Sequence, residues 1–198
     1  MSKYRPTFLI LFALLSALTL PGCGFSPQSA ENFVNRAIAR NTRGDLDGAI
    51  ADCTKAIELN PNYAPAYFYR GLAKLKKDDW DGAIADNSKT IEFTPNLALA
   101  YNNRGFARMA KGDQDGAIAD YSKGIDLNPK FFIAYNNRGN ARKAKGDLDG
   151  AIDDYSKAIE IYPKNVDAYN NRGETRKAKG DKAGADADFA QATKLKGP

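Results

Sequence analysis

The chain has 198 residues, of which 43% are hydrophobic, and its 29 Lys and Arg against 24 Asp and Glu give a formal net charge of +5. This composition is ordinary for one globular domain or two small ones. The chain has no histidine, so it lacks the commonest general base and metal ligand, and two cysteines are too few for a disulfide scaffold or a thiolate metal cage. These counts argue against most enzyme classes, and we expect no catalytic residues, no metal and no cofactor.

The first 22 residues have the pattern of an export signal. Lys3 and Arg5 precede an apolar run over residues 7–20. A run of this length is typical of a secretory signal and falls short of the ~20 residues that span a bilayer. After residues 1–22 are removed, 27 basic and 24 acidic side chains remain. An excess of +3 without clustering does not predict nucleic-acid binding.

The signal ends in Leu20-Pro21-Gly22-Cys23, which resembles the lipobox of bacterial lipoproteins. The resemblance implies cleavage before Cys23, a diacylglycerol on its sulfur and a fatty acyl group, such as palmitate, on the new N-terminus. Three acyl chains satisfy the need of a stable anchor for more than one lipid. Pro21 departs from the small or β-branched residue that is usual there, and an ordinary signal with an incidental Cys23 remains the alternative.

The residue after the cysteine bears on the membrane that would hold the anchor. In lipoprotein families where Asp at that position causes inner-membrane retention, Gly24 would favour the outer membrane. We therefore expect a lipid-anchored protein of the bacterial cell envelope that faces the periplasm, with residues 23–29 as the lipidated cysteine and a short tether.

From Ala30 onward the sequence repeats every 34 residues, and a period of this length indicates a solenoid. The five copies span residues 30–63, 64–97, 98–131, 132–165 and 166–198. Each copy predicts two helices. The first ends at a glycine in copies one, three, four and five, as a left-handed C-terminal residue requires, while Asp78 stands there in copy two. An Asp then caps the second helix, which stops before a proline in the first four copies.

Several positions of the repeat hold one kind of residue in every copy. The eighth and twentieth are Gly or Ala, and the fourth is aromatic, so we expect large side chains of one helix to pack on small ones of its partner. A single helix pair cannot bury its own apolar face, so the copies must stack. The polar second helix of the fifth copy is expected to cap the stack. Cys53 stands where later copies have Tyr or Phe, which predicts a buried, inert thiol, with a redox or intermolecular disulfide site as the alternative.

The pattern resembles the tetratricopeptide repeat, and the third copy carries the family's marks at Tyr101, Gly105, Ala117, Tyr121 and Pro129. The resemblance covers residues 30–198. It implies an all-α, right-handed solenoid of five 34-residue helix-turn-helix repeats that binds proteins without catalysing a reaction.

One departure from the family is systematic. The seventh position is always Arg and the twenty-third always Asp: Arg36 and Asp52, Arg70 and Asp86, Arg104 and Asp120, Arg138 and Asp154, Arg172 and Asp188. Because Arg pairs with carboxylates through two hydrogen bonds, we expect a ladder of ion pairs that ties first helices to second helices. A row of anion-binding arginines is the functional alternative.

In this family the first helices line the concave face, and the helical period places positions 2, 5, 9 and 12 on one side. These positions change from apolar to polar along the chain, as a binding surface would. The candidate peptide groove comprises Val34, Ile38, Phe68, Leu72, Phe106, Met109, Asn136, Asn140, Lys143 and Asn170, with Leu75 and Leu99 as apolar positions that could instead pack between repeats. A row of amides at position 6, Asn35, Asn103, Asn137 and Asn171, could hold an extended backbone or could bond the adjacent helices.

The sequence therefore predicts an exported, lipid-anchored adaptor that holds a peptide or protein partner in the concave groove. The alternative is a structural envelope protein that forms a homodimer through the apolar face of repeats one to three.

Overall fold

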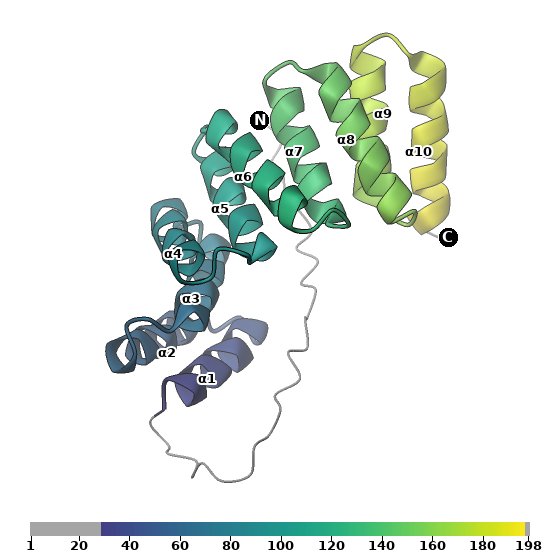
Figure 1. Cartoon of the computed structure of the whole chain (residues 1–198). Coiled ribbons are helices and arrows are strands. Elements are labelled where there is room, and N and C mark those ends of the chain that lie inside the picture. Colours follow the sequence, from purple (N-terminus) through teal and green to yellow (C-terminus); the bar gives the residue numbers. More distant parts are fainter. Residues whose placement is uncertain (1–28, 197–198) are drawn as a thin grey trace.

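The computed structural model describes residues 29–196, and within that range the chain forms ten α-helices and no strand. The bounds are α1 Ala30–Thr42, α2 Leu46–Leu59, α3 Ala64–Lys76, α4 Trp80–Phe93, α5 Ala98–Ala110, α6 Gln114–Leu127, α7 Phe132–Ala144, α8 Leu148–Ile161, α9 Val166–Ala178 and α10 Lys182–Lys196. Each odd-numbered helix begins at the first residue of a 34-residue copy. Five helix pairs follow one another along an arc (Figure 1), which confirms the predicted all-α solenoid.

The turn inside each helix pair follows from two residues. The first helix ends at a glycine with φ near +85° in repeats one, three, four and five, while Asp78 adopts φ 59° in repeat two. The next Asp caps the second helix: the Asp147 carboxylate, for example, accepts from the backbone N–H of Gly150 at 2.9 Å. Because its oxygen satisfies a backbone donor that has no partner within the helix, this Asp fixes where the second helix begins.

Small residues let the two helices of a pair approach closely. In repeats three to five, a Cβ added at the eighth-position glycine would lie 2.6–2.9 Å from the ring of Tyr121, Tyr155 or Phe189. These rings come from position 24 of the second helix. The expected packing of large on small side chains is therefore present. The aromatic rings at position 4 make cation–π contacts, because they lie 4.9–5.7 Å from the guanidinium groups of the seventh-position arginines.

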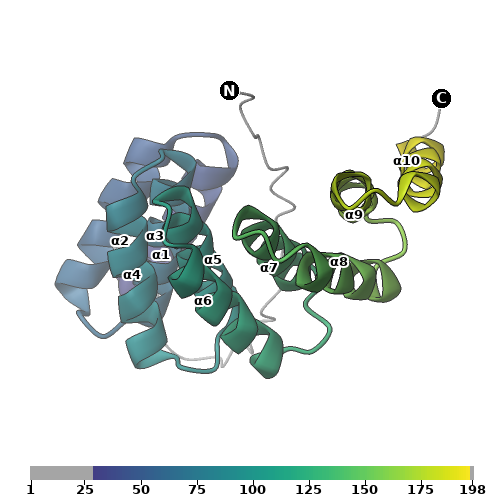
Figure 2. The same ribbon diagram turned by 90° about the horizontal axis from the view of Figure 1, so that it is seen from above.

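The odd-numbered helices form the inner layer of the solenoid. Consecutive odd-numbered helices contact one another, whereas among the described residues no two even-numbered helices do. Seen from above, α7 and α9 turn away from the block of α1 to α6, so that the arc is open on the side of the odd helices (Figure 2). The core between neighbouring repeats consists largely of fully buried alanines, among them Ala66, Ala100, Ala134 and Ala168 at position 3. None of the helices between residues 29 and 196 is long and apolar enough to cross a membrane.

Candidate peptide-binding groove

All five predicted Arg–Asp pairs form. In each, the arginine Nε and Nη2 donate to the two oxygens of one carboxylate at 2.5–3.0 Å, and the aspartate is buried. The four internal arginines also donate from Nη1 to a hydroxyl of the preceding repeat at 2.9–3.2 Å. The arginine forks are thus occupied by groups of the chain itself, which favours the structural interpretation over an anion-binding row.

A second cation reaches each of these carboxylates, and sequence reasoning missed it. Arg40, Lys74, Arg108, Arg142 and Arg176 lie 2.7–3.2 Å from the ladder aspartates. The signal was available, because position 11 is basic in every repeat. In repeats one, three, four and five this second cation also lies 3.6–3.7 Å from the Asp that caps the second helix, so it joins the two carboxylates. At Arg70, burial lowers the side-chain pKa, but the hydrogen bond and the charge of Asp86 outweigh it and raise the pKa above its ordinary value.

The apolar half of the candidate groove lies on α1, α3 and α5. Ile38, Phe68, Leu72, Phe106 and Met109 are half-buried, so each keeps surface that a partner can contact. The Phe106 ring meets the indole of Trp80 edge-on, with centroids 6.0 Å apart. Leu99 is also half-buried and packs beside Ile125 and Phe131.

Two apolar positions of this face do not belong to an open groove. Val34 keeps only 3% of its surface exposed and packs with Ala56 and Ala66, because position 5 of the first repeat faces the second repeat. Leu75 is likewise buried, with Ala83 and Ala107 around it. The assignment of Val34 to the groove is corrected: it is a core residue between repeats.

The polar half of the groove lies on α7 and α9, and its side chains bond to one another or to α8. Lys143 pairs with Glu174 at 2.8 Å, the Tyr155 hydroxyl donates to Asn140 Oδ1 at 2.8 Å, and Asn136 Oδ1 accepts from Asn171 at 3.2 Å. Asn136, Asn140, Lys143 and Asn170 are all half-buried. This surface is therefore a preorganised set of polar groups with part of its hydrogen-bonding capacity open.

Two of the four amides at position 6 form hydrogen bonds between neighbouring first helices. Asn137 donates to Asn102 Oδ1 at 3.0 Å and Asn171 donates to Asn136, so each links its helix to the preceding odd-numbered helix. Asn103 is buried, and Asn35 is exposed on α1. The alternative in which these amides bond the adjacent helix holds for Asn137 and Asn171.

The second repeat places an unusual side chain at position 24. Asn87 is fully buried beside Gly71, where later repeats have an aromatic ring, and its Nδ2 donates to the carbonyl of Ala83 at 2.8 Å. Its Oδ1 has no hydrogen-bond partner among the described residues. Cys53 fills the same position in repeat one, where the Tyr69 ring packs against its cluster. Burial raises the pKa of the Cys53 thiol to about 12, so it stays protonated at neutral pH.

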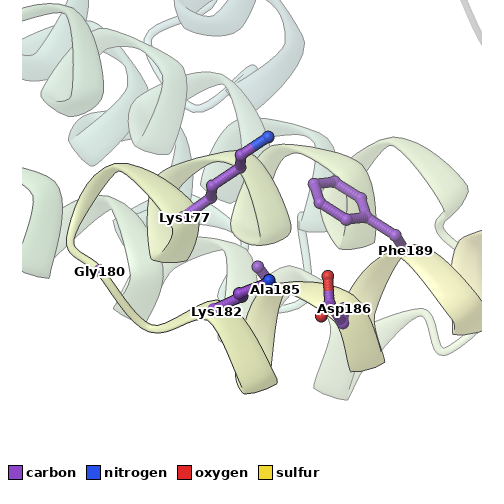
Figure 3. Close-up of a pocket in the computed structure, with 6 residues that line it drawn as sticks. All are labelled: Lys177, Gly180, Lys182, Ala185, Asp186 and Phe189. Atoms are coloured by element: carbon purple, nitrogen blue, oxygen red, sulfur yellow. The ribbon is translucent and has the colours of Figure 1, made fainter.

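The last repeat differs at its outer surface. A shallow pocket of about 380 Å³ lies between Lys177 of α9 and Lys182, Ala185, Asp186 and Phe189 of α10, near the turn at Gly180 (Figure 3). In repeats one to four, positions 17 and 21 face the next repeat and are mostly apolar. Position 17 is Leu46, Trp80, Gln114 and Leu148, and position 21 is Ile50, Ile84, Ile118 and Ile152. In the last repeat these positions are Lys182 and Asp186. The polar substitutions agree with the expected cap. Cys23 and the export signal lie outside the described residues.

Comparison with known proteins agrees with this architecture. A family model described as TPR repeat matches residues 39–78, 107–146 and 139–180, and a second, described as Tetratricopeptide repeat, matches residues 166–197. No curated protein sequence matches the chain.

Solved structures share the fold. A crystal structure of MamA is 28% identical, with a TM-score of 0.75 over 81% of this chain and 94% of that chain, and another of MamA protein is 26% identical, with a TM-score of 0.76 over 86% and 93%. YrrB, described as a TPR protein with an unusual peptide-binding site, is 22% identical, with a TM-score of 0.70 over 86% and 88%. Because the TPR repeat model covers more than half of the chain, the protein belongs to the tetratricopeptide repeat family, whose fold is a protein–protein interaction scaffold.

Proposed function

We propose that the protein is a non-catalytic adaptor that binds a peptide segment of a partner protein along the inner face of α1, α3, α5, α7 and α9. One observation carries the proposal. The scaffold positions stay constant through five repeats, while this face changes from half-buried apolar side chains to half-buried polar ones. Side chains that vary on a fixed scaffold, on a face that the solenoid leaves open, are the ones that select a partner.

The chemistry of the two halves sets the expected orientation of the ligand. Apolar side chains of the peptide would contact Leu72, Phe106 and Met109, and polar or charged ones would lie toward Asn140 and Lys143. YrrB, described as having an unusual peptide-binding site, supports peptide binding by this fold by analogy alone.

The groove is tested with a double substitution and a matched control. In Leu72→Asp with Phe106→Asp, two carboxylates enter the apolar half. In Ala85→Asp with Ala119→Asp, the same two charges enter the same two repeats at exposed sites of α4 and α6. Each full-length chain, solubilised from bacterial envelope in detergent, is used to capture partners. A protein that is retained by wild type and control and lost from the groove variant supports the proposal.

The same experiment can contradict the proposal. If a partner is captured equally by all three chains, and circular dichroism shows that all three are folded, the groove is not the binding site.

We further propose that the chain is exported and anchored by lipid on Cys23 in the outer membrane of a bacterial envelope. The basic, apolar and Leu20–Cys23 segments support this. Cells that express the full chain are fed a labelled fatty acid. We expect label in the wild type, none in Cys23→Ser, and wild-type chain in the outer-membrane fraction. Equal labelling of both chains, or an unlabelled wild type, contradicts the anchor.

The second candidate function is self-association through the apolar half of the groove, which the exposed surface of Phe68, Leu72 and Phe106 favours. Light scattering on the detergent-solubilised chain distinguishes the two. A stable dimer that Leu72→Asp with Phe106→Asp converts to a monomer supports self-association, and a monomeric wild type excludes it.

A further inference from the structure

The four contacts between neighbouring repeats are built alike. The seventh-position arginine donates to a Thr or Ser hydroxyl on the second helix of the preceding repeat: Arg70 to Thr54, Arg104 to Ser88, Arg138 to Ser122 and Arg172 to Ser156. The fourteenth-position lysine pairs with an Asp seven residues earlier on that same helix: Lys77 with Asp47, Lys111 with Asp81, Lys145 with Asp115 and Lys179 with Asp149. Between them, position 10 is a fully buried Ala or Thr.

These contacts define the kind of helix that binds to this face of a first helix. The bound helix runs antiparallel to it and carries a carboxylate and, two turns later, a hydroxyl. Residues seven apart lie on one face of a helix, so a single side of the bound helix supplies both acceptors.

Helix α1 presents the same face with no repeat before it. Arg36, Ala39 and Arg43 stand at positions 7, 10 and 14. The side chain of Arg36 is 54% exposed, against 15–18% for its four equivalents, and its Nη1 has no hydrogen-bond partner within residues 29–196. Ala39 is exposed, and Arg43 forms no ion pair in the described range. Helix α1 thus carries the donor side chains found at the internal interfaces, but no helix of the described residues supplies their acceptors.

The opposite edge has lost the acceptors. On α10, Ala183 and Ala190 replace the Asp and the hydroxyl that the other second helices carry, and Lys182, Asp186 and Thr193 stand at interface positions that are mostly apolar elsewhere. The acceptors of α2, α4, α6 and α8 are already bound within the solenoid. Within residues 29–196, a second copy of the chain therefore has no helix with free acceptors that could dock against α1.

We propose that the surface formed by Arg36, Ala39 and Arg43 is a second docking site, separate from the groove, for an amphipathic helix of another protein. The bound helix lies antiparallel to α1, with an Asp or Glu against Arg43 and a Ser or Thr, seven residues later, against Arg36. A small or apolar side chain covers Ala39. Residues 1–28 contain no Asp or Glu, so the preceding segment of the chain does not have this chemistry.

The probe is a fluorescent peptide with the sequence of α8, residues 148–161, which carries Asp149 and Ser156 at the required spacing. A hydrocarbon staple between positions 150 and 154, on the side of the helix opposite both acceptors, holds it helical. A second peptide has Asp149→Ala and Ser156→Ala, the pattern of α10. Binding to the detergent-solubilised full chain is measured by fluorescence anisotropy.

The test variant is Ala39→Glu with Arg43→Glu, because neither residue contributes an ion pair to the fold. Its control is Ala119→Glu with Lys123→Glu, the same change of charge at the same spacing on exposed positions of α6. We expect the stapled peptide to bind wild type, the control and the groove variant Leu72→Asp with Phe106→Asp equally. Binding to the test variant should fall by about tenfold or more, and the alanine peptide should bind as weakly.

The proposal would be overturned by no binding of the stapled peptide to wild type, by equal binding to the test variant, or by equal binding of both peptides. A wild-type dimer that the test variant alone dissociates would show that the surface joins two copies, which also contradicts a heterologous partner.

Discussion

Arg138 and Asp154, one on α7 and the other on α8, are joined by two hydrogen bonds. Arg138 Nη2 lies 2.7 Å from Oδ1 and Nε lies 3.0 Å from Oδ2, while Arg142 Nη1 reaches the same Oδ2 at 2.8 Å. Asp154 is buried, and Arg138 also donates to Ser122 of the preceding repeat. Asp154 therefore holds Arg138 in a position that joins both the helix pair and the preceding repeat.

The pair should be energetically coupled. Asp154→Leu leaves Arg138 and Arg142 without their buried carboxylate, and we expect it to cost about 2–4 kcal/mol of the free energy of unfolding, since both arginines keep some exposure to water. Arg138→Leu with Asp154→Leu should cost less than the sum of the single changes by about 1–3 kcal/mol. Urea unfolding of the four chains measures this, and additive losses would contradict the ladder.

Gly139 should tolerate no side chain. A Cβ at this position would lie 2.6 Å from Cε1 of the buried Tyr155 ring, whose hydroxyl is held by Asn140. We expect Gly139→Ala to destabilise the chain by about 1–3 kcal/mol, although alanine is the better helix former. Thermal unfolding measures the change, and a more stable variant would show that α7 and α8 do not approach this closely.

Asn87 should be a weak point of the second repeat. Its buried Oδ1 lacks a partner among the described residues, which costs about 1–3 kcal/mol, whereas a leucine of similar size leaves no polar atom unpaired. We expect Asn87→Leu to raise the urea midpoint. A lower midpoint would mean that the hydrogen bond from Nδ2 to Ala83 outweighs the unpaired oxygen.

Cys53 should make stability fall at alkaline pH. Burial raises the pKa of the native thiol from 9.0 to about 12, so the native state keeps a proton that the unfolded chain releases. This contribution is complete below about pH 9 and is lost as the pH rises toward 12.

In a Cys23→Ser background, Cys53→Ala should therefore lose less stability than its parent between about pH 8 and pH 11. Buried Tyr121 acts in the same direction, because burial raises its pKa too, so Tyr121→Phe is measured in parallel. If Cys53 reacts with a thiol reagent as fast in the native chain as in urea, the thiol is not buried.

The repeat period was enough to predict the helices and the ladder. Five copies in register place Gly146, Asp147 and the Arg138–Asp154 pair at equivalent sites, and each plays the expected local role because its contacts lie within one repeat or its neighbour. The second cation, Arg142, follows the same period and was overlooked.

The groove was less predictable from the sequence. Val34 and Ile38 belong to the same face by helical spacing, yet Val34 is buried and Ile38 is half-buried. Which of them keeps open surface depends on how far each repeat rotates against the next, and that small rotation is a property of the whole stack. The ring that packs on Gly139, Tyr155, was not identified from the sequence, because sequence spacing does not say which ring of a neighbouring helix points inward.

The most direct test of the adaptor account is site-specific photocrosslinking in bacterial cells that make the full chain. A benzophenone side chain replaces Phe106, which is half-buried on the inner face, or Ala119, which is exposed on α6. The account predicts that light links position 106, and not position 119, to a specific partner protein. Crosslinks from position 119 alone, or only between two copies of this chain at position 106, would contradict it.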